Sequence, residues 1–235
     1  MITFVTFKWR PRPGYRSKFE GWHVDVLRRM IARNYHAPHR FACITDDPLG
    51  IEEPDTEVWE LWDDLASIPN PSGSRNPSCY RRLKLFAANA GSWIGDRVVC
   101  IDLDAVICGD ITDMFAGDET FRIWSGTGGW NRYNGSLWML KTGAHPEIWE
   151  DFDPEASPKQ TRMAGCNGSD QGWFAYKFRD AAVFTSSDGV YSYRNEVART
   201  GRLASNARIV FFHGRHDPWD KDMHSKHHWI REHYR

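Results

Sequence analysis

Two carboxylates one residue apart, Asp102 and Asp104, interrupt an otherwise apolar run from Val98 to Ile107. An apolar, β-branched run of this kind is typical of a strand that is buried on both faces. Ionised aspartate is almost never fully buried unless its charge is compensated. Because side chains alternate along a strand, this spacing places both carboxylates on one side, where a divalent cation would relieve their repulsion. Oxygen ligands favour Mg²⁺ or Mn²⁺ over Zn²⁺, so the sequence predicts a hard-metal site at the end of a central strand and phosphate chemistry beside it.

The size and charge of the chain limit the classes of protein to which it can belong. Its 235 residues suit a single α/β domain with a proper core, and no linker-like segment divides them. The formal net charge is −1, which argues against a nucleic-acid partner or an extended membrane surface. No apolar run reaches the length of a transmembrane segment, and the first residues do not resemble a signal peptide. Five cysteines without metal-type spacing predict free thiols, and we therefore expect a cytoplasmic protein.

Strand-like and helical segments alternate in the first half of the chain. Before the aspartate-bearing run, strands are expected at Ile2–Lys8, Arg40–Thr45 and Glu57–Trp62, and helices at Phe19–Asn34 and Cys79–Ala90. This order predicts an α/β fold with a mixed, mostly parallel sheet of the Rossmann type, flanked by helices. Ligands of such sheets bind beyond the carboxyl ends of the strands, where the strand order reverses. The aspartates lie late in their strand and therefore near that point.

The second half has shorter strands and longer connections. Strands are expected at Phe121–Ser125, Ser136–Lys141 and Arg208–Phe212, and a helix at Asp170–Phe178. Met223, Ile230 and Tyr234 share one face of an amphipathic tail. Loops that could shape a substrate pocket are expected at Ala66–Ser78, Gly126–Arg132 and Ser157–Ser169.

Four motifs follow one another in the chain. They are Cys79–Leu83 with its arginines, the Asp102–Asp104 pair, the loop Tyr133–Leu137, and a late pair made of Gly168–Gln171 and Phe211–Trp219. Their order resembles that in the glycogenin-like, retaining glycosyltransferases of the GT-A fold, and the chain is most similar to bacterial and phage members of that group. That family has an arginine-bearing helix before its DxD motif, an Asn-Ser-Gly-type loop, an Asp-Gln pair and a late His…Gly…Lys-Pro-Trp segment. The resemblance covers most of the chain, from the first strand to the tryptophan of the last motif.

The resemblance implies a hexosyltransferase with a GT-A-like fold. It would transfer a hexose from a nucleotide sugar, most simply a UDP-sugar, to a glycan, a lipid-linked sugar or a protein, with retention of configuration. Residues 1–110 would form the nucleotide-binding half, 111–220 the acceptor and metal half, and 221–235 a helical tail. Mn²⁺ or Mg²⁺ would act as a Lewis acid on the departing diphosphate.

The resemblance also implies a role for individual residues. Metal ligands would be Asp102, Asp104 and His213; donor-binding residues would be Lys8, Asp46, Arg82, Asp102, Asn134, Gly214 and Arg215; and Asp170 and Gln171 would be catalytic. The catalytic pair would face the anomeric carbon, where an oxocarbenium-like transition state needs negative charge nearby.

The last motif departs from the family pattern in two ways. The family places its late His three residues before the Gly, and Phe211 holds that position, whereas His213 directly precedes the Gly. The family's phosphate-binding Lys is replaced by Asp217, whose negative charge would repel a diphosphate. Arg215 or His216 would then have to supply the missing positive charge.

Each motif also has a simpler structural interpretation. Asp102 and Asp104 could cap a strand end or form salt bridges, and Arg82 could form an ion pair on the surface of a helix. Asn134 begins an Asn-Gly pair, which is a hairpin-turn signal. Asp170 could cap the helix that follows it.

Two other functions fit parts of the sequence. The segment from Asp102 to Val106 also resembles the DxDx[TV] signature of the haloacid-dehalogenase phosphohydrolases, in which Asp102 would be the nucleophile and Asp104 the acid/base. That family usually begins with this motif, whereas about a hundred residues precede it in this chain. The twelve tryptophans would also suit a non-catalytic carbohydrate-binding protein, which would leave the buried carboxylates unexplained.

Overall fold

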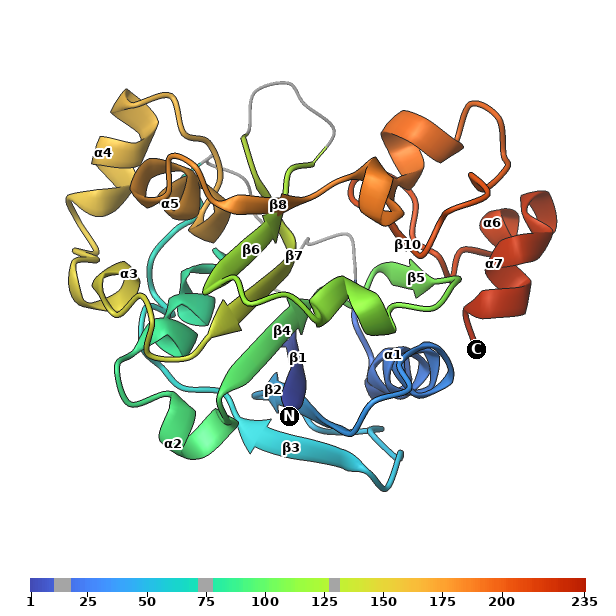
Figure 1. Ribbon diagram of the computed structural model, residues 1–235, viewed down its shortest axis with the longest axis horizontal. Coiled ribbons are helices and arrows are strands. Elements are labelled where there is room, and N and C mark those ends of the chain that lie inside the picture. Colours follow the sequence, from blue (N-terminus) through green and yellow to red (C-terminus); the bar gives the residue numbers. More distant parts are fainter. Residues whose placement is uncertain (11–17, 72–77, 127–131) are drawn as a thin grey trace.

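The computed structural model describes residues 1–10, 18–71, 78–126 and 132–235. Its centre is a seven-stranded sheet with the strand order β3-β2-β1-β4-β7-β6-β8 (Figure 1). The strands are β1 (Ile2–Lys8), β2 (His39–Thr45), β3 (Thr56–Glu60), β4 (Arg97–Ile101), β6 (Phe121–Trp124), β7 (Asn134–Lys141) and β8 (Ala182–Phe184). Parallel pairs are β1 with β2, β1 with β4, β2 with β3, and β6 with β8, whereas β7 is antiparallel to both β4 and β6. The expected mixed, mostly parallel α/β sheet is confirmed.

A smaller sheet lies beside the first one, with the order β5-β10-β9. Its strands are β5 (Ala105–Ile107), β9 (Val190–Ser192) and β10 (Ile209–Phe211). The α-helices are α1 (Gly21–Asn34), α2 (Gly91–Ile94), α3 (Glu147–Glu150), α4 (Ser157–Met163), α5 (Asp170–Lys177), α6 (Lys221–Lys226) and α7 (His228–His233). Shorter helical turns are the 3₁₀ segments η1 (Tyr80–Phe86), η2 (Thr112–Phe115) and η3 (Ser186–Asp188), and the π-helix η4 (Tyr193–Val197).

The strand order reverses between β1 and β4. From β1 the chain adds β2 and β3 on one side, and then returns to place β4 on the other side. The side chains of β1 and β4 are almost all buried, which agrees with their mostly apolar sequences. The carboxyl ends of these two strands therefore meet at the position where a parallel sheet presents its ligand site.

The apolar run that carries the two aspartates is not one strand. The backbone N–H of Asp102 still donates to the carbonyl of Ser136 on β7, 3.0 Å away, whereas the carbonyl of Asp104 accepts from the N–H of Phe212, after β10, at 2.9 Å. The chain thus leaves the large sheet and enters the small one across Leu103. This break corrects the expected continuous strand, and it brings the charged residues to a sheet end while the apolar residues on either side remain buried.

The segment before the aspartates is wound more tightly than expected. The sequence predicted an α-helix at Cys79–Ala90, but η1 is a 3₁₀-helix, in which the N–H of Arg82 donates to the carbonyl of Cys79. With three residues per turn, Cys79 and Arg82 lie on one face. Both of these side chains line the cavity described below.

One expected loop is a helix. The segment Ser157–Ser169 begins with α4, so the prediction of a loop throughout it was wrong. Pro158 lies in the first turn of α4, where its missing N–H costs nothing and its fixed φ favours helix formation. The other two loop predictions, at Ala66–Ser78 and Gly126–Arg132, fall partly outside the described residues.

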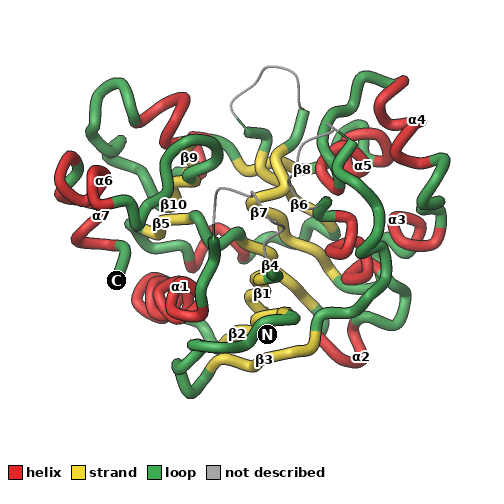
Figure 2. The backbone as a smooth tube through the Cα atoms, turned by 180° about the vertical axis from the view of Figure 1, so that it is seen from behind, coloured by secondary structure: helices red, strands yellow, loops and turns green. Residues whose placement is uncertain are grey.

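The end of the chain packs against α1, and Figure 2 shows α7 beside that helix. The guanidinium of Arg33 donates to the backbone carbonyls of His233 and Arg235, at 2.7 Å and 2.6 Å. Met223, Ile230 and Tyr234 are buried, which confirms the expected inner face of the tail. All five cysteines are free thiols, as predicted. No helix among the described residues has the length and apolar character that a membrane span requires.

Candidate active site

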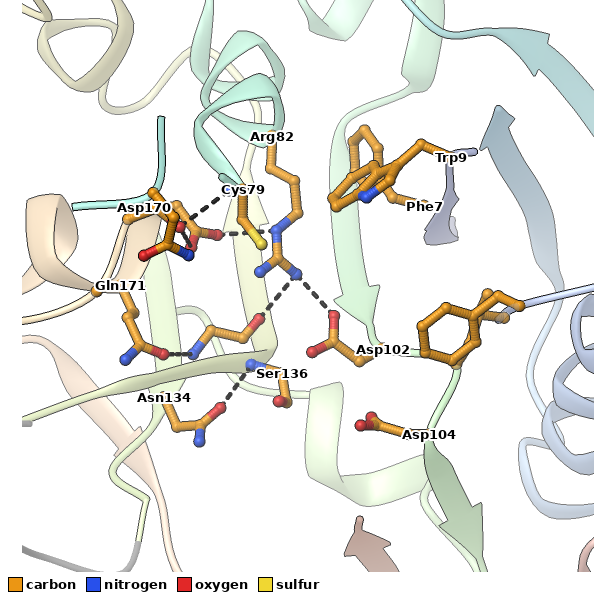
Figure 3. A pocket seen from close by; sticks show the side chains of 16 residues that line it. Phe7, Trp9, Cys79, Arg82, Asp102, Asp104, Asn134, Ser136, Asp170 and Gln171 are labelled. Carbon is orange, nitrogen blue, oxygen red and sulfur yellow. Dashed lines mark hydrogen bonds and ion pairs between the residues drawn. The ribbon is translucent and has the colours of Figure 1, made fainter. Parts of the chain in front are cut away.

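A cavity of about 420 Å³ opens beyond the carboxyl ends of β1 and β4 (Figure 3). Phe7 and Trp9 line it from the end of β1, and the Asp102–Asp104 segment lines it from the end of β4. Six residues predicted from the motifs lie in its wall: Arg82, Asp102, Asp104, Asn134, Asp170 and Gln171. The chain thus gathers residues from all four motifs at the reversal point of the sheet.

Arg82 connects the acidic groups of this cavity. Its Nη1 lies 2.7 Å from Asp102 Oδ1 and donates to the carbonyl of Gly135 at 3.1 Å. Its Nε forms an ion pair with Asp170 Oδ2 at 2.8 Å. Figure 3 shows the guanidinium between the two carboxylates. The structure therefore places Arg82 inside the cavity wall, not on the exposed helix face that the simpler interpretation required.

The charges of Arg82 and Asp170 depend on each other. Their side chains are only 5% and 3% exposed. Burial raises the pKa of the Asp170 carboxyl; Arg82 opposes that shift, and Asp102 adds to it. The pKa of the Arg82 guanidinium is raised well above its usual value, because Asp170 and its other neighbours outweigh the opposing effect of burial. A permanently charged arginine thus favours the ionised form of a carboxylate that burial alone would neutralise.

The loop from Asn134 to Ser136 forms one side of the cavity and begins β7. The side-chain Oδ1 of Asn134 accepts from the N–H of Ser136 at 2.9 Å, and Gln171 Oε1 accepts from the N–H of Gly135 at 3.3 Å. A Cβ atom on Gly135 would lie 3.2 Å from Arg82 Nη2 and 3.3 Å from Asp170 Oδ2. Gly135 therefore lets the loop approach the ion pair closely, and the Asn-Gly pair is not the turn of a two-residue hairpin.

Two residues in this wall lie within the motifs but were given no role from the sequence. Ser169 precedes α5, and its hydroxyl accepts from the N–H of Cys79 at 2.9 Å and lies 3.4 Å from Asp170 Oδ1. It therefore joins the start of η1 to the start of α5. Its position before a helix is an N-cap signal that could have identified it. Cys79 carries no such signal, because only the 3₁₀ winding turns it towards the cavity.

The two aspartates of the DxD motif offer carboxylate oxygens, which are the ligands that a hard divalent cation prefers. Both line the same cavity, and Asp102, whose side chain is 35% exposed, uses one oxygen to bind Arg82. Among the described residues, however, no three His, Cys, Asp or Glu side chains converge closely enough to hold a metal ion. Nε2 of His213 lies 2.8 Å from the Ser192 hydroxyl, and burial lowers the pKa of this imidazole. His213 as the third ligand stays a prediction.

The other predicted donor-binding residues lie outside this cavity wall. Lys8 is buried, and its Nζ binds Asp47 Oδ2 at 2.8 Å. Asp46 Oδ1 accepts from the N–H of Arg10 at 2.9 Å. Gly214 and Arg215 are exposed.

The departures in the last motif have visible packing consequences. Phe211, at the position of the family's histidine, is fully buried and stacks on Trp124 with a centroid distance of 4.9 Å. Asp217, at the position of the family's lysine, is buried as well. Phe211 thus contributes to the core of the small sheet, and the chain keeps no polar group at that position.

Comparison with known proteins gives matches at the level of structure. No protein-family model matches the chain, and no curated protein matches it in sequence. The galactosyltransferase LgtC, solved in complex with donor and acceptor sugar analogs, has a TM-score of 0.63 and 14% identity, with 99% of this chain and 96% of LgtC covered. The glycosyltransferase GlyE of Streptococcus pneumoniae TIGR4 has a TM-score of 0.54 and 13% identity, and the bifunctional WbbM a TM-score of 0.56 and 10% identity. The alignments cover 94% of this chain and 56% of GlyE, and 99% of this chain and 50% of WbbM, so the chain spans about half the length of those two proteins.

The chain has the GT-A glycosyltransferase fold. In this GT-A fold the reversal point between β1 and β4 carries the acidic pair, and the later segments of the chain add Asn134 and Asp170 to the same cavity. The fold that the order of the motifs implied is therefore the fold that the chain has.

Proposed function

We propose that the chain is a metal-dependent glycosyltransferase that transfers a hexose from a nucleotide sugar, with UDP-hexose as the first candidate, and retains the anomeric configuration. The observation that carries this proposal is the link through Arg82 between Asp102 and Asp170, inside a cavity at the reversal point of a GT-A fold. A cavity built for binding alone would not need three buried or half-buried charges held together in this way.

Asp102 and Asp104 would hold Mn²⁺ or Mg²⁺, which supplies Lewis-acid stabilisation to a departing diphosphate when it is bound. Asn134 would then orient donor-sugar hydroxyls. Asp170 and Gln171 would lie near the anomeric carbon, and the negative charge on Asp170 would stabilise an oxocarbenium-like transition state. Arg82 supports this role because it opposes the effect of burial on Asp170.

The acceptor is proposed more broadly, as a hydroxyl of a glycan, a lipid-linked sugar or a protein. Neither competing function gains support from a specific contact. A phosphohydrolase would need Asp102 as a nucleophile, but Asp102 Oδ1 is bound by Arg82. A non-catalytic sugar-binding protein would not explain the buried Arg82–Asp170 pair.

A direct test is the hydrolysis of a panel of nucleotide sugars with and without Mn²⁺. We expect Mn²⁺-dependent release of a nucleoside diphosphate from at least one donor, and its loss in Asp104→Asn. Asp118→Asn is the matched control, because Asp118 is an exposed aspartate outside the cavity. Full activity of Asp104→Asn would remove this residue from the mechanism. Turnover of p-nitrophenyl phosphate without any donor hydrolysis would favour the phosphohydrolase.

A further inference from the structure

A second cavity, of about 420 Å³, lies at the edge of the large sheet. The carboxyl end of β3 lies near α2 at this edge, as Figure 1 shows. Three tryptophans line it, Trp59 on β3, Trp62 just after β3, and Trp93 on α2, together with Glu60 and Lys84. All three indoles are half-buried, so each anchors in the core and still presents surface to the cavity. None of these residues belongs to the motifs discussed above.

The indoles are held in place by contacts inside the protein. The Nε1 of Trp62 donates to the carbonyl of Arg81 at 2.8 Å, and the Nε1 of Trp59 donates to Glu57 Oε2 at 3.3 Å. With these N–H groups engaged, both rings offer mainly carbon surface to a ligand.

The three rings are tilted against one another at the pocket surface. The centroids of Trp59 and Trp93 lie 5.6 Å apart at an interplanar angle of 46°, and those of Trp62 and Trp93 lie 5.9 Å apart at 73°. Because the ring planes differ in direction, a ligand seated in this open pocket can contact more than one indole at the same time. The size of the cavity is that of a small-molecule site.

Charged groups of both signs surround these rings. The Lys84 ammonium lies 5.3 Å from the centroid of the Trp62 ring and 2.6 Å from Asp64 Oδ2. The Glu60 carboxylate is exposed and also belongs to the lining. A ligand that suits this cavity therefore has an apolar face for the indoles and neutral hydroxyls that can both donate to carboxylates and accept from an ammonium.

We propose that this aromatic pocket, formed by Trp59, Trp62 and Trp93, binds a saccharide. A pyranose ring has C–H faces that stack on indoles and a rim of hydroxyls that match Glu60 and Lys84. Trp62 also contacts Phe7, with a centroid distance of 5.8 Å, and Phe7 lines the first cavity. We infer that the bound saccharide is a part of the acceptor glycan remote from the reacting hydroxyl, and this last step rests on the proposed function.

Saccharide binding is tested with fluorine NMR on protein labelled with fluorotryptophan, in which each of the twelve tryptophans gives its own signal. Single Trp→Phe variants assign the signals. The probes are cellohexaose, maltohexaose and lactose. We expect at least one probe to shift the signals of Trp59, Trp62 and Trp93, and Trp93→Ala to weaken that binding by about tenfold, the contribution of one aromatic contact.

Trp22 is the matched control, because its side chain is 41% exposed and lies outside the pocket. Equal shifts at Trp22 would show unspecific contact and overturn the proposal, as would the absence of a shift at the three pocket tryptophans with all probes. Two assays separate the two hypotheses: donor hydrolysis by the wild-type protein, and saccharide binding by Asp104→Asn. If the wild-type protein hydrolyses no donor while Asp104→Asn still binds saccharides normally, the proposed function fails and the aromatic pocket stands.

Discussion

The Arg82 guanidinium lies 2.7 Å from Asp102 Oδ1 and, through its Nε, 2.8 Å from Asp170 Oδ2. One side chain thus links the DxD motif to the Asp-Gln motif, which are separated by more than sixty residues in the sequence. The side chain of Asp102 remains partly accessible to solvent, whereas that of Asp170 is almost completely buried. We conclude that Arg82 both balances the charge of the cavity and determines where the two carboxylates lie.

Replacing Arg82 is expected to affect stability and activity together. Arg82→Gln leaves Asp170 buried without its cation, and breaking a buried pair in this way costs about 3–5 kcal/mol of unfolding free energy. Arg82→Lys keeps the positive charge but cannot bridge two carboxylates with one planar group, so we expect most of the stability and little of the donor hydrolysis to remain. Urea denaturation and donor hydrolysis measure the two effects. Unchanged hydrolysis in Arg82→Lys would show that the bridge is not needed for activity.

The pH dependence of donor hydrolysis tests the charge of Asp170. Burial raises the pKa of this carboxyl and Arg82 opposes the shift, so removing Arg82 should raise it further. If Asp170 must be ionised for activity, its higher pKa in Arg82→Gln moves the acidic limb of the profile of kcat/KM against pH to higher pH. Arg122→Gln is the control, since Arg122 pairs with Asp188 outside the cavity. An acidic limb that stays in place would mean that Asp170 does not set it.

Gly21, the first residue of α1, is expected to tolerate no side chain. A Cβ at this position would lie 2.1 Å from the carbonyl carbon of Gly50. Helix propensity alone predicts that Gly21→Ala stabilises α1. Because the added Cβ overlaps backbone atoms, we expect the variant instead to lose about 2 kcal/mol of unfolding free energy. Ala32→Gly, at an exposed position in the same helix, calibrates the propensity effect at about 1 kcal/mol. A Gly21→Ala variant more stable than the wild type in urea would contradict the close approach.

The sequence predicted the parts of the fold whose causes are local. Ile2–Lys8 is rich in β-branched and aromatic residues and forms β1 with the expected bounds. The rule for parallel sheets placed the DxD pair at the reversal point. The predictions that failed depend on the tertiary structure. The break after Asp102 follows from the presence of a second sheet, and the 3₁₀ winding that turns Cys79 and Arg82 inward follows from their partners in the cavity. Neither partner lies nearby in the sequence, so no local pattern reveals these features.

His23 should make the folded protein sensitive to acid. It is nearly fully buried between the rings of Trp22 and Trp219, with centroid distances of 3.7 Å and 4.2 Å. Its Nδ1 accepts from the N–H of Glu20 at 2.8 Å, which requires an unprotonated nitrogen. Burial, which is only partly opposed by Glu20, lowers the pKa of His23 from 6.5 to about 4. The imidazole is therefore neutral in the folded protein at a pH where the unfolded chain binds a proton.

The sign of the effect follows from this difference in proton binding. Because the unfolded state binds more protons between pH 6.5 and about 4, the free energy of unfolding falls as the pH falls through that range, and it is unaffected by His23 above it. This shift in the pKa of His23 corresponds to a loss of about 3 kcal/mol of unfolding free energy as the pH falls from 6.5 to about 4. Urea denaturation of the wild type and of His23→Gln at the two pH values measures it, with the exposed His36→Gln as control. We expect His23→Gln to be less stable at neutral pH and to lose less stability on acidification. Equal losses in the wild type and His23→Gln would assign the acid sensitivity to other groups, since burial also lowers the pKa values of His213, His227 and His233.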